Sequence, residues 1–269
     1  MIEKTGRTAL VTGASRGIGK AVALSLIEDG WEVIGTCRNP KSLVPEERLP
    51  GVRYLALDLS SPRSVAGLAK KIGIVDLLVN NAGESPIGPA EEAPLDTVRG
   101  HFQVNLFGPL QLTQALLSGM RLRRGGTVIF IGSMRGEAPT PFSSLYSASK
   151  AAIRSLAECL RMEVKPFGVA VSVIAPWHIR TTLAQELVMA ARSPYAGALK
   201  RVKARRDVMI AHAADPIVVA RAVLKITRTA RPKSFHSVGK NAALQSFLVR
   251  HLPRGIIESS SARRFGMKG

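Results

Sequence analysis

Short runs of apolar residues alternate with amphipathic, helix-length segments along most of the chain. The first pair shows the pattern, because the apolar run Thr8–Val11 is followed by Ile18, Val22 and Leu26 at helical spacing, and Gly30 ends that helix. Further apolar or β-branched runs predict strands at residues 31–36, 52–57, 77–79, 127–131, 169–174 and 235–238. Helices are predicted between them at residues 61–71, 98–117 and 145–165.

This order predicts the fold class. Short, wholly apolar strands joined by crossover helices are typical of a parallel sheet that helices cover on both faces. We therefore predict an α/β fold, a Rossmann-like doubly wound sheet in a single domain of residues 1–269. Residues from about 177 to 210 are expected to form a helical substrate lid, and residues from about 240 to 269 a basic C-terminal appendage.

Composition narrows the class of protein. The 269 residues are 46% hydrophobic and 21% charged, which is enough to bury a sizeable core and argues against disorder. Two cysteines, Cys37 and Cys159, exclude a disulfide framework. The charged N-terminus has no apolar leader, and no apolar run could span a bilayer, so a cytoplasmic location is expected.

The net charge of +19 is concentrated in the last third of the chain. Residues 181–269 hold 17 lysines and arginines against 4 acidic residues. Such a field attracts phosphate cofactors, acidic carrier proteins, anionic lipid or nucleic acid, and it is also compatible with a merely solvated face. Nucleic acid is disfavoured because aromatic residues are few and no helix-turn-helix or zinc spacing is present. The five histidines lack ligand spacing, so no metal is expected.

Gly13, Gly17 and Gly19 lie between the first predicted strand and its helix. Glycine lets the backbone approach a pyrophosphate closely, and the helix N-terminus presents unpaired N–H groups to the anion. The motif by itself could serve only tight packing, but its position after a strand predicts a dinucleotide site.

The end of the second strand indicates which dinucleotide is bound. NAD-specific folds usually place an acid there, whereas this chain reads Thr36, Cys37 and Arg38. Arg16 and Arg38 together could clamp a ribose 2′-phosphate, which predicts NADP(H). Two merely exposed arginines would not account for the missing acid.

Tyr146 and Lys150 are four residues apart on a predicted helix and therefore share a face. A nearby ammonium favours the phenolate form of a tyrosine, so such a tyrosine can exchange protons near neutral pH. A Tyr-x-x-x-Lys pair by itself is common in proteins. Ser133, at the end of a predicted strand thirteen residues earlier, makes the pattern more specific for a catalytic site.

These motifs together resemble the short-chain dehydrogenase/reductase family, from about Arg7 to Thr181. TGASRGIG is similar to the family's cofactor turn, NNAG to its sheet-stabilising element, and VNLFG to the segment whose asparagine holds a proton-relay water. The resemblance implies hydride transfer between nicotinamide and a carbonyl or alcohol carbon, with Asn105, Ser133, Tyr146 and Lys150 as the catalytic set. Together with the glycine turn and the arginines, it implies a cofactor site of Gly13, Ser15, Arg16, Gly17, Ile18, Gly19, Arg38, Asp58, Leu59, Asn81, Ala82, Gly83, Tyr146, Lys150, Pro176 and Thr181.

One segment departs from the family pattern. After the sixth strand, where the family usually has Pro-Gly and then a threonine, the chain has Pro176, Trp177, His178 and, three residues later, Thr181. Thr181 can still contact the cofactor carboxamide. Trp177 puts the backbone path in doubt and is expected to direct its ring toward the substrate, whose other predicted contacts are Ser133, Phe142 and Tyr146. We interpret His178 as a loop residue.

The substrate stays open at this point. The apolar lid favours a lipophilic ketone or alcohol. Pro141-Phe142 just before the tyrosine and PFGV at residues 166–169 resemble the 17β-hydroxysteroid and retinol dehydrogenase branch. A 3-oxoacyl reductase is the alternative, because a basic lid cluster could dock an acidic carrier protein or coenzyme A. That cluster comprises Lys200, Arg201, Lys203, Arg205 and Arg206. A peripheral contact with an anionic membrane through Arg250, Arg254, Arg263 and Arg264, and a non-catalytic NADP-sensing regulator, are weaker alternatives. The resemblance also implies a homodimer or homotetramer.

Overall fold

The computed structural model describes residues 6–181 and 186–267, and its centre is a sheet of seven parallel strands. The spatial order is β3-β2-β1-β4-β5-β6-β7, with every neighbouring pair parallel. The strands are β1 Thr8–Val11, β2 Glu32–Cys37, β3 Val52–Ala56, β4 Leu77–Asn80, β5 Gly126–Ile131, β6 Val169–Pro176 and β7 Phe235–Val238. The predicted doubly wound α/β fold is confirmed, and the strand ends differ from the predictions by two residues at most.

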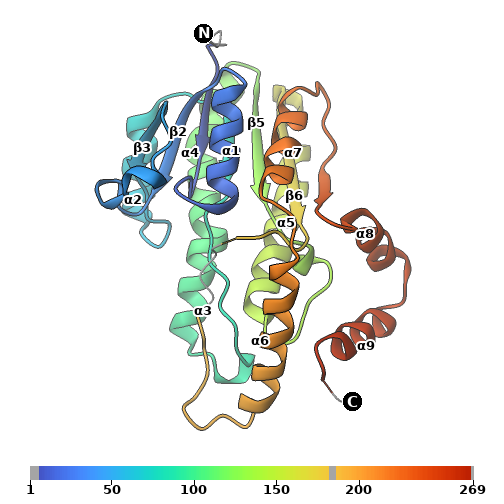
Figure 1. Ribbon diagram of the computed structural model, residues 1–269. Coiled ribbons are helices and arrows are strands. Elements are labelled where there is room, and N and C mark those ends of the chain that lie inside the picture. Colours follow the sequence, from blue (N-terminus) through green and yellow to red (C-terminus); the bar gives the residue numbers. More distant parts are fainter. Residues whose placement is uncertain (1–5, 182–185, 268–269) are drawn as a thin grey trace.

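Helices cover both faces of the sheet (Figure 1). Helices α1 (Gly17–Glu28) and α7 (Ile217–Thr227) pack side by side on one face, where Leu26 and Val223 belong to one buried cluster. The other face carries α2 (Pro62–Ile72), α4 (Gly108–Leu122) and α5 (Ser144–Val164). The wholly buried strands follow from this arrangement, because both sides of each central strand pack against helices.

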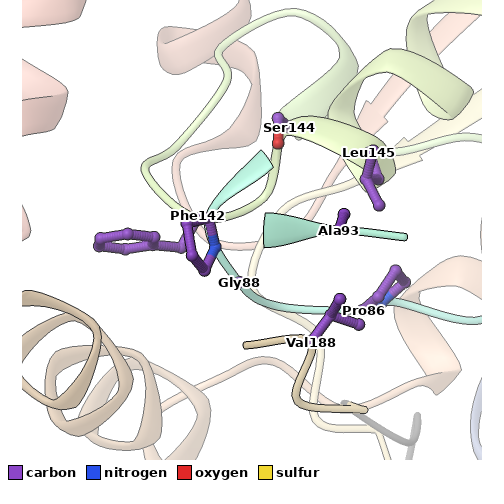
Figure 2. A pocket seen from close by; sticks show the side chains of 8 residues that line it. Pro86, Gly88, Ala93, Phe142, Ser144, Leu145 and Val188 are labelled. Atoms are coloured by element: carbon purple, nitrogen blue, oxygen red, sulfur yellow. The ribbon is translucent and has the colours of Figure 1, made fainter. Parts of the chain in front are cut away.

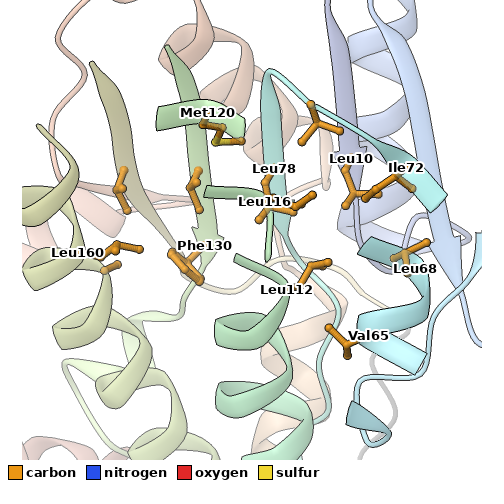
Figure 3. Close-up of a cluster of buried hydrophobic side chains, with 14 of the residues drawn as sticks. Leu10, Val65, Leu68, Ile72, Leu78, Leu112, Leu116, Met120, Phe130 and Leu160 are labelled. Atoms are coloured by element: carbon orange, nitrogen blue, oxygen red, sulfur yellow. The ribbon is translucent and has the colours of Figure 1, made fainter. Parts of the chain in front are cut away.

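The larger buried cluster lies between the sheet and the second helix layer (Figure 3). Leu10, Leu78 and Phe130 project from the sheet, and Leu112 and Leu116 project from α4 onto them. All five side chains are buried. This core fixes the position of the strand ends, and those ends carry the polar residues of the site.

The strand order reverses between β1 and β4. Chain connections leave the sheet in opposite directions at such a point, so a crevice opens outside the carboxyl ends of the two strands. The glycine turn that follows β1 and the segment that follows β4 both begin there. The fold therefore places the predicted cofactor residues where dinucleotides bind in sheets of this kind.

The predicted helix 98–117 is longer and less regular than expected. Helix α3 (Leu95–Phe102) continues through a π-helical turn, Gln103–Phe107, into α4. Pro109 has no N–H and cannot make the regular bond to the residue four positions earlier, which favours the wider turn. Asn105 lies in this turn, so the irregularity sets the direction of a predicted catalytic side chain.

The predicted helical lid is only partly helical. Helix α6 spans Ala196–Ala211, whereas residues 186–195 contain no helix and Leu187 forms a β-bridge with Ile87. Pro194 restricts the backbone just before the helix and explains its late start. Residues 182–185 of the predicted lid lie outside the described residues.

The C-terminal appendage forms two helices, α8 (Ala242–His251) and α9 (Arg254–Arg264). It is fastened to the body of the protein, because the Arg205 guanidinium donates to the Arg264 carbonyl and Ser261 Oγ donates to the Pro139 carbonyl. Within residues 6–181 and 186–267, no helix is both long and apolar enough to cross a membrane. The same ranges contain no group of three or more His, Cys, Asp or Glu side chains that could hold a metal ion.

Candidate active site

The glycine turn leaves no room for side chains. Gly13 and Gly17 adopt φ values of +67° and +55°, a left-handed conformation that favours glycine. A Cβ added to Gly19 would lie 2.1 Å from the Gly13 carbonyl oxygen. The backbone of the turn therefore stays bare next to the N-terminus of α1, as a pyrophosphate site requires.

Two residues brace this turn from the neighbouring strand. The buried Thr12 hydroxyl accepts hydrogen bonds from the backbone N–H groups of Asn81 and Ala82, both at 2.9 Å. The Asn81 side-chain amide donates to the Thr12 carbonyl at 2.8 Å. The side chain of Asn81 thus holds the turn in place, and direct cofactor contacts by Asn81 and Ala82 remain a prediction.

The other predicted cofactor residues lie around the same crevice. Arg16 is the exposed N-cap residue of α1, and Arg38 is exposed just beyond β2. Asp58 Oδ1 accepts from both the backbone N–H and the hydroxyl of Ser60, at 2.9 and 2.7 Å. Leu59 is 5% exposed, so its side chain belongs to the core and only its backbone is free to face a ligand.

Thr181 lies opposite the glycine turn. Its Cβ would be 3.8 Å from a Cβ added to Gly17, which brings the end of the β6 segment next to the start of α1. Ser15 and Ile18, within the turn, and Pro176, at the end of β6, are half-buried around the same opening. A bare glycine cradle at a helix N-terminus, bordered by two exposed arginines, fits a nicotinamide dinucleotide.

The Tyr146 and Lys150 side chains point the same way. Both lie near the start of α5, and the Lys150 Nζ is 5.7 Å from the centre of the Tyr146 ring. The same Nζ donates a 2.8 Å hydrogen bond to the Ile131 carbonyl at the end of β5. Ser133 follows Ile131 by two residues, and its Oγ accepts from the Arg135 backbone N–H at 3.1 Å. The predicted serine and the Tyr146–Lys150 pair therefore both lie at the carboxyl end of β5, and their joint catalytic role stays a prediction.

The side chain of Lys150 is buried. Its residue is 7% exposed, and burial lowers its pKa while the nearby Tyr146 acts in the opposite direction. The two side chains are therefore electrostatically coupled, since the phenolate form of the tyrosine would stabilise the charged lysine.

Asn105 reaches the same cluster from the π-helical turn. Its Oδ1 accepts from the Glu84 backbone N–H at 2.9 Å, and its Nδ2 donates to the Ser149 hydroxyl at 3.2 Å. A Cβ added to Gly83 would touch Asn105 Oδ1 at 3.0 Å and Lys150 Nζ at 3.8 Å. Glycine at position 83 is thus required for the asparagine and the lysine to approach each other.

Sequence reasoning missed His101. It is 1% exposed, its Nε2 lies 3.1 Å from the Ser149 hydroxyl, and its Nδ1 lies 3.3 Å from Glu84 Oε1. This extends the Asn105 network to a half-exposed carboxylate. The signal in the sequence was the spacing of His101 and Asn105, four residues apart on one helix, which by itself is too common to single out.

A small cavity lies beside the first turn of α5 (Figure 2). Phe142, a predicted substrate contact, borders it, but its ring points away from Val188 and Leu145 in Figure 2 and meets the Tyr195 ring edge-on at 6.1 Å. The cavity is lined by Pro86, Gly88, Pro89, Ala93, Phe142, Ser144, Leu145 and Val188. Its wall is apolar, as the sequence predicted for the substrate side.

Trp177 has a structural role as well as a place at the site. The residue is 9% exposed and packs in a cluster with Met134 and Ala242, so α8 covers part of the ring. It also borders a second small cavity. Beside it, burial and then the charges of Arg135 and Arg264 lower the pKa of His178 to about 4. The imidazole is therefore neutral at pH 7 and is a poor second proton donor.

The second cavity contains two guanidinium groups that the sequence did not assign to the site. Arg135 and Arg206 both line it, and Arg135 lies 5.5 Å from the centre of the Tyr146 ring. The prediction that Arg206 belongs to an exposed docking cluster is wrong, because Arg206 is 2% exposed. It lies on the inner face of α6 with Leu199 and Val202, while the other four predicted members are exposed.

Comparison with known proteins identifies the family. A model of the short chain dehydrogenase family matches residues 7–191. The chain belongs to this family. It is 36% identical to dehydrogenase/reductase SDR family member 7B of Bos taurus over 201 residues, which are 69% of this chain and 62% of that protein. It is 37% identical to 3-ketodihydrosphingosine reductase of Bacteroides thetaiotaomicron over 176 residues, or 64% of each chain.

The family resemblance also extends to structure. A crystal structure of a short-chain dehydrogenase from Streptomyces avermitilis shares the fold with a TM-score of 0.81 and 31% identity, and the match covers 98% of both chains. The curated relatives are longer, since the chain spans less than two thirds of the length of the two proteins described above. The chain is therefore a member of the short chain dehydrogenase family and has the fold of a solved short-chain dehydrogenase.

Proposed function

We propose that the protein is an NADP(H)-dependent oxidoreductase that transfers hydride between the nicotinamide and a carbonyl or secondary alcohol of a lipophilic substrate. The observation that supports it best is the anchoring of Lys150 to the Ile131 carbonyl at 2.8 Å, with Tyr146 on the same face of α5. The first test is a screen that follows NADPH absorbance against steroids, retinal, quinones and acetoacetyl thioesters. Oxidation of NADPH by none of these would argue against the proposal.

Each side chain has a defined part in the reductive direction. Tyr146 donates its hydroxyl proton to the oxygen of the carbonyl group, and Ser133 donates a hydrogen bond to the same oxygen. Lys150 stabilises the phenolate that remains and binds the nicotinamide ribose. Asn105 connects the site to solvent through its network. The bound cofactor supplies the hydride.

The preference for NADP(H) is supported by Arg16 and Arg38, two exposed guanidiniums that border the glycine turn and the end of β2. We expect Arg38→Asp to lower the ratio of kcat/KM for NADPH over NADH by roughly 100-fold, because a charge-assisted bond is lost and an acid repels the phosphate. Steady-state kinetics with both cofactors measures the ratio. Arg53→Asp, which makes the same charge change at the exposed start of β3, should leave it unchanged. A ratio that Arg38→Asp does not alter would contradict the clamp.

A lipophilic substrate is supported by the mostly apolar wall of the first cavity, through Val188 and Leu145, and by the apolar part of the second, through Trp177 and Met209. Such surfaces gain free energy by leaving water, about 25 cal/mol for each Å² buried. This favours steroid-like, retinoid-like or other long ketones over sugars. The 3-ketodihydrosphingosine reductase among the relatives carries a long-chain ketone in its name, which is compatible with this class.

A 3-oxoacyl reductase acting on a carrier protein or coenzyme A ester is the second candidate. It is favoured by four exposed cations of α6, Lys200, Arg201, Lys203 and Arg205. If an acidic carrier protein docks there, its KM should rise at least tenfold between 50 and 300 mM salt, since screening weakens exposed charge pairs. The KM of a small neutral ketone, measured in the same series, should change by less than about twofold. Equal salt dependence of the two substrates would exclude carrier docking.

Attachment to an anionic membrane is a weaker alternative. Arg250, Arg254, Arg263 and Arg264 are exposed, which is compatible with an anionic membrane surface. Arg254 also donates to the Glu137 carbonyl, so part of this charge fastens the appendage.

A non-catalytic regulator is disfavoured because all four catalytic positions are filled. A homodimer or homotetramer built on the helices of Asn105 and Tyr146 stays a prediction.

A further inference from the structure

Arg206 is a buried cation whose hydrogen-bonding capacity is mostly unused. Its residue is 2% exposed, and its Nη2 donates one 2.7 Å bond to the Ser143 hydroxyl. Nε and Nη1 are buried and have no partner among the described residues. A buried polar group without a partner costs free energy, and a buried guanidinium costs more than a neutral group. The single hydrogen bond to Ser143 does not offset the free-energy cost of burying this cation. No contact among the described residues therefore accounts for the burial of Arg206.

A second guanidinium faces the same space. Arg135 lines the second cavity together with Arg206. Within residues 6–181 and 186–267, neither side chain forms an ion pair with a carboxylate. The acid nearest in sequence, Asp207, is exposed. Two like charges in a partly dry cavity repel each other, so the site is incomplete without an anion.

The electrostatics agree with this geometry. Burial, followed by the like charge of Arg135, lowers the pKa of Arg206 to about 9, while Tyr146 and Asp207 act in the opposite direction. Burial also lowers the pKa of Arg135, again against the influence of Tyr146. Both guanidiniums are therefore coupled to the tyrosine that we propose as the proton donor.

We propose that the carbonyl substrate carries an anionic group, a carboxylate or a phosphate monoester, which binds between Arg206 and Arg135. The inference rests on the proposed function only in placing the reacting carbonyl at Tyr146. Arg135 lies 5.5 Å from the centre of the Tyr146 ring and lines the same cavity as Arg206, so the anionic group lies within a few bonds of the carbonyl carbon. The planar fork of arginine presents parallel N–H groups to carboxylate or phosphate oxygens, and these would satisfy Nε and Nη1 of Arg206.

The rest of the cavity wall indicates an amphiphile. Trp177, Met209, Ile210 and Phe265 supply apolar surface beside the two cations. Phe265 ends α9 and is 3% exposed, so the C-terminal appendage forms part of this wall. A wholly neutral ketone would bury against this surface but would leave both charges unpaired. A ketone with an apolar chain and an anionic group matches both parts of the wall.

Matched substrates test the proposal. The reductions of 4-oxodecanoate, its methyl ester, 2-oxodecyl phosphate and the corresponding neutral 2-oxodecyl acetate are compared by kcat/KM. We expect at least one anionic ketone to exceed its neutral counterpart by about 30-fold or more, and the carboxylate and phosphate pairs tell the two sources of charge apart. Equal kcat/KM within both pairs would overturn the proposal while leaving the reductase itself established.

Variants of the arginine give the second test. Arg206→Met should bring the anionic-to-neutral ratio close to one, and Arg206→Lys, which keeps the charge but not the fork, should give an intermediate ratio. Arg221→Met, which removes an exposed cation from α7, should keep the wild-type ratio. A ratio that Arg206→Met does not alter would contradict a role for Arg206 in anion binding.

A binding readout separates this inference from the catalytic one. Decanoate should raise the Tm of the wild-type protein by about 2–4 °C, decanol should not, and Arg206→Met should lose the decanoate shift. Without ligand, Arg206→Met should be at least as stable as the wild type, because it removes an unpaired buried charge. A strong fall in Tm with the substrate ratio unchanged would assign Arg206 a structural role instead. A decanoate shift in a protein that reduces no ketone would keep the anion site and reject the proposed function.

Discussion

Replacing Tyr146 by phenylalanine is expected to lower kcat for ketone reduction by about 1,000-fold, the upper part of the range for general acid catalysis. The change removes one oxygen atom and keeps the ring, whose residue is 8% exposed between Lys150 and Arg135. The proton for the alkoxide would then have to come from water, with no donor held in position. Rapid-mixing measurements of NADPH oxidation at saturating substrate give the rate of the chemical step.

The same variant separates catalysis from binding. The affinity for NADPH, measured by fluorescence titration, should change by less than about threefold, since the glycine turn and the Lys150 anchor at the Ile131 carbonyl remain. Tyr195→Phe is the matched control, because its hydroxyl donates only to Glu91 at the surface, and its kcat should stay near the wild-type value. If Tyr146→Phe kept most of its activity, Tyr146 would not be the proton donor. If it lost cofactor binding together with kcat, the tyrosine would have a mainly structural role.

The fold could be predicted because its signal is local and redundant. Each central strand is short and apolar on both faces, as Leu10 on one face and Val11 on the other show, and each is followed by a helix. The glycine turn and the Tyr146–Lys150 spacing are likewise local, since their residues lie within one turn of each other. The structure of such local features can therefore be predicted from the sequence.

The missed features depend on packing between distant segments. Arg206 looks like one of five basic residues until the docking of α6 decides which side is covered. Its spacing from Leu199 and Val202 was the available signal, because residues seven and four positions earlier lie on the same helical face. Charged residues are rarely buried, so a single arginine on an otherwise apolar helix face is expected to be exposed. Only the structure shows that Arg135, 71 positions away, meets it in one cavity.

The glycine turn gives the second large effect. Gly19→Ala should raise the Kd for NADPH by about 100-fold or more, equivalent to about 2.8 kcal/mol. The added Cβ would lie 2.1 Å from the Gly13 carbonyl oxygen and 2.6 Å from the Asn81 amide nitrogen. Neither atom can withdraw easily, because Gly13 is backbone and Asn81 donates to the Thr12 carbonyl. The turn would have to open, and the N–H groups would no longer point at one pyrophosphate position.

A helical glycine supplies the control that makes this result specific. Gly100 lies in α3, and a Cβ added there meets no atom within 4 Å. Gly100→Ala should therefore leave the Kd unchanged and raise the free energy of unfolding by up to about 1 kcal/mol, since alanine favours the helix. Titration calorimetry with NADPH and chemical denaturation of both variants measure the two effects. If Gly19→Ala bound NADPH as tightly as Gly100→Ala, the turn would tolerate a side chain, and the cofactor would have to bind without close contact to this backbone.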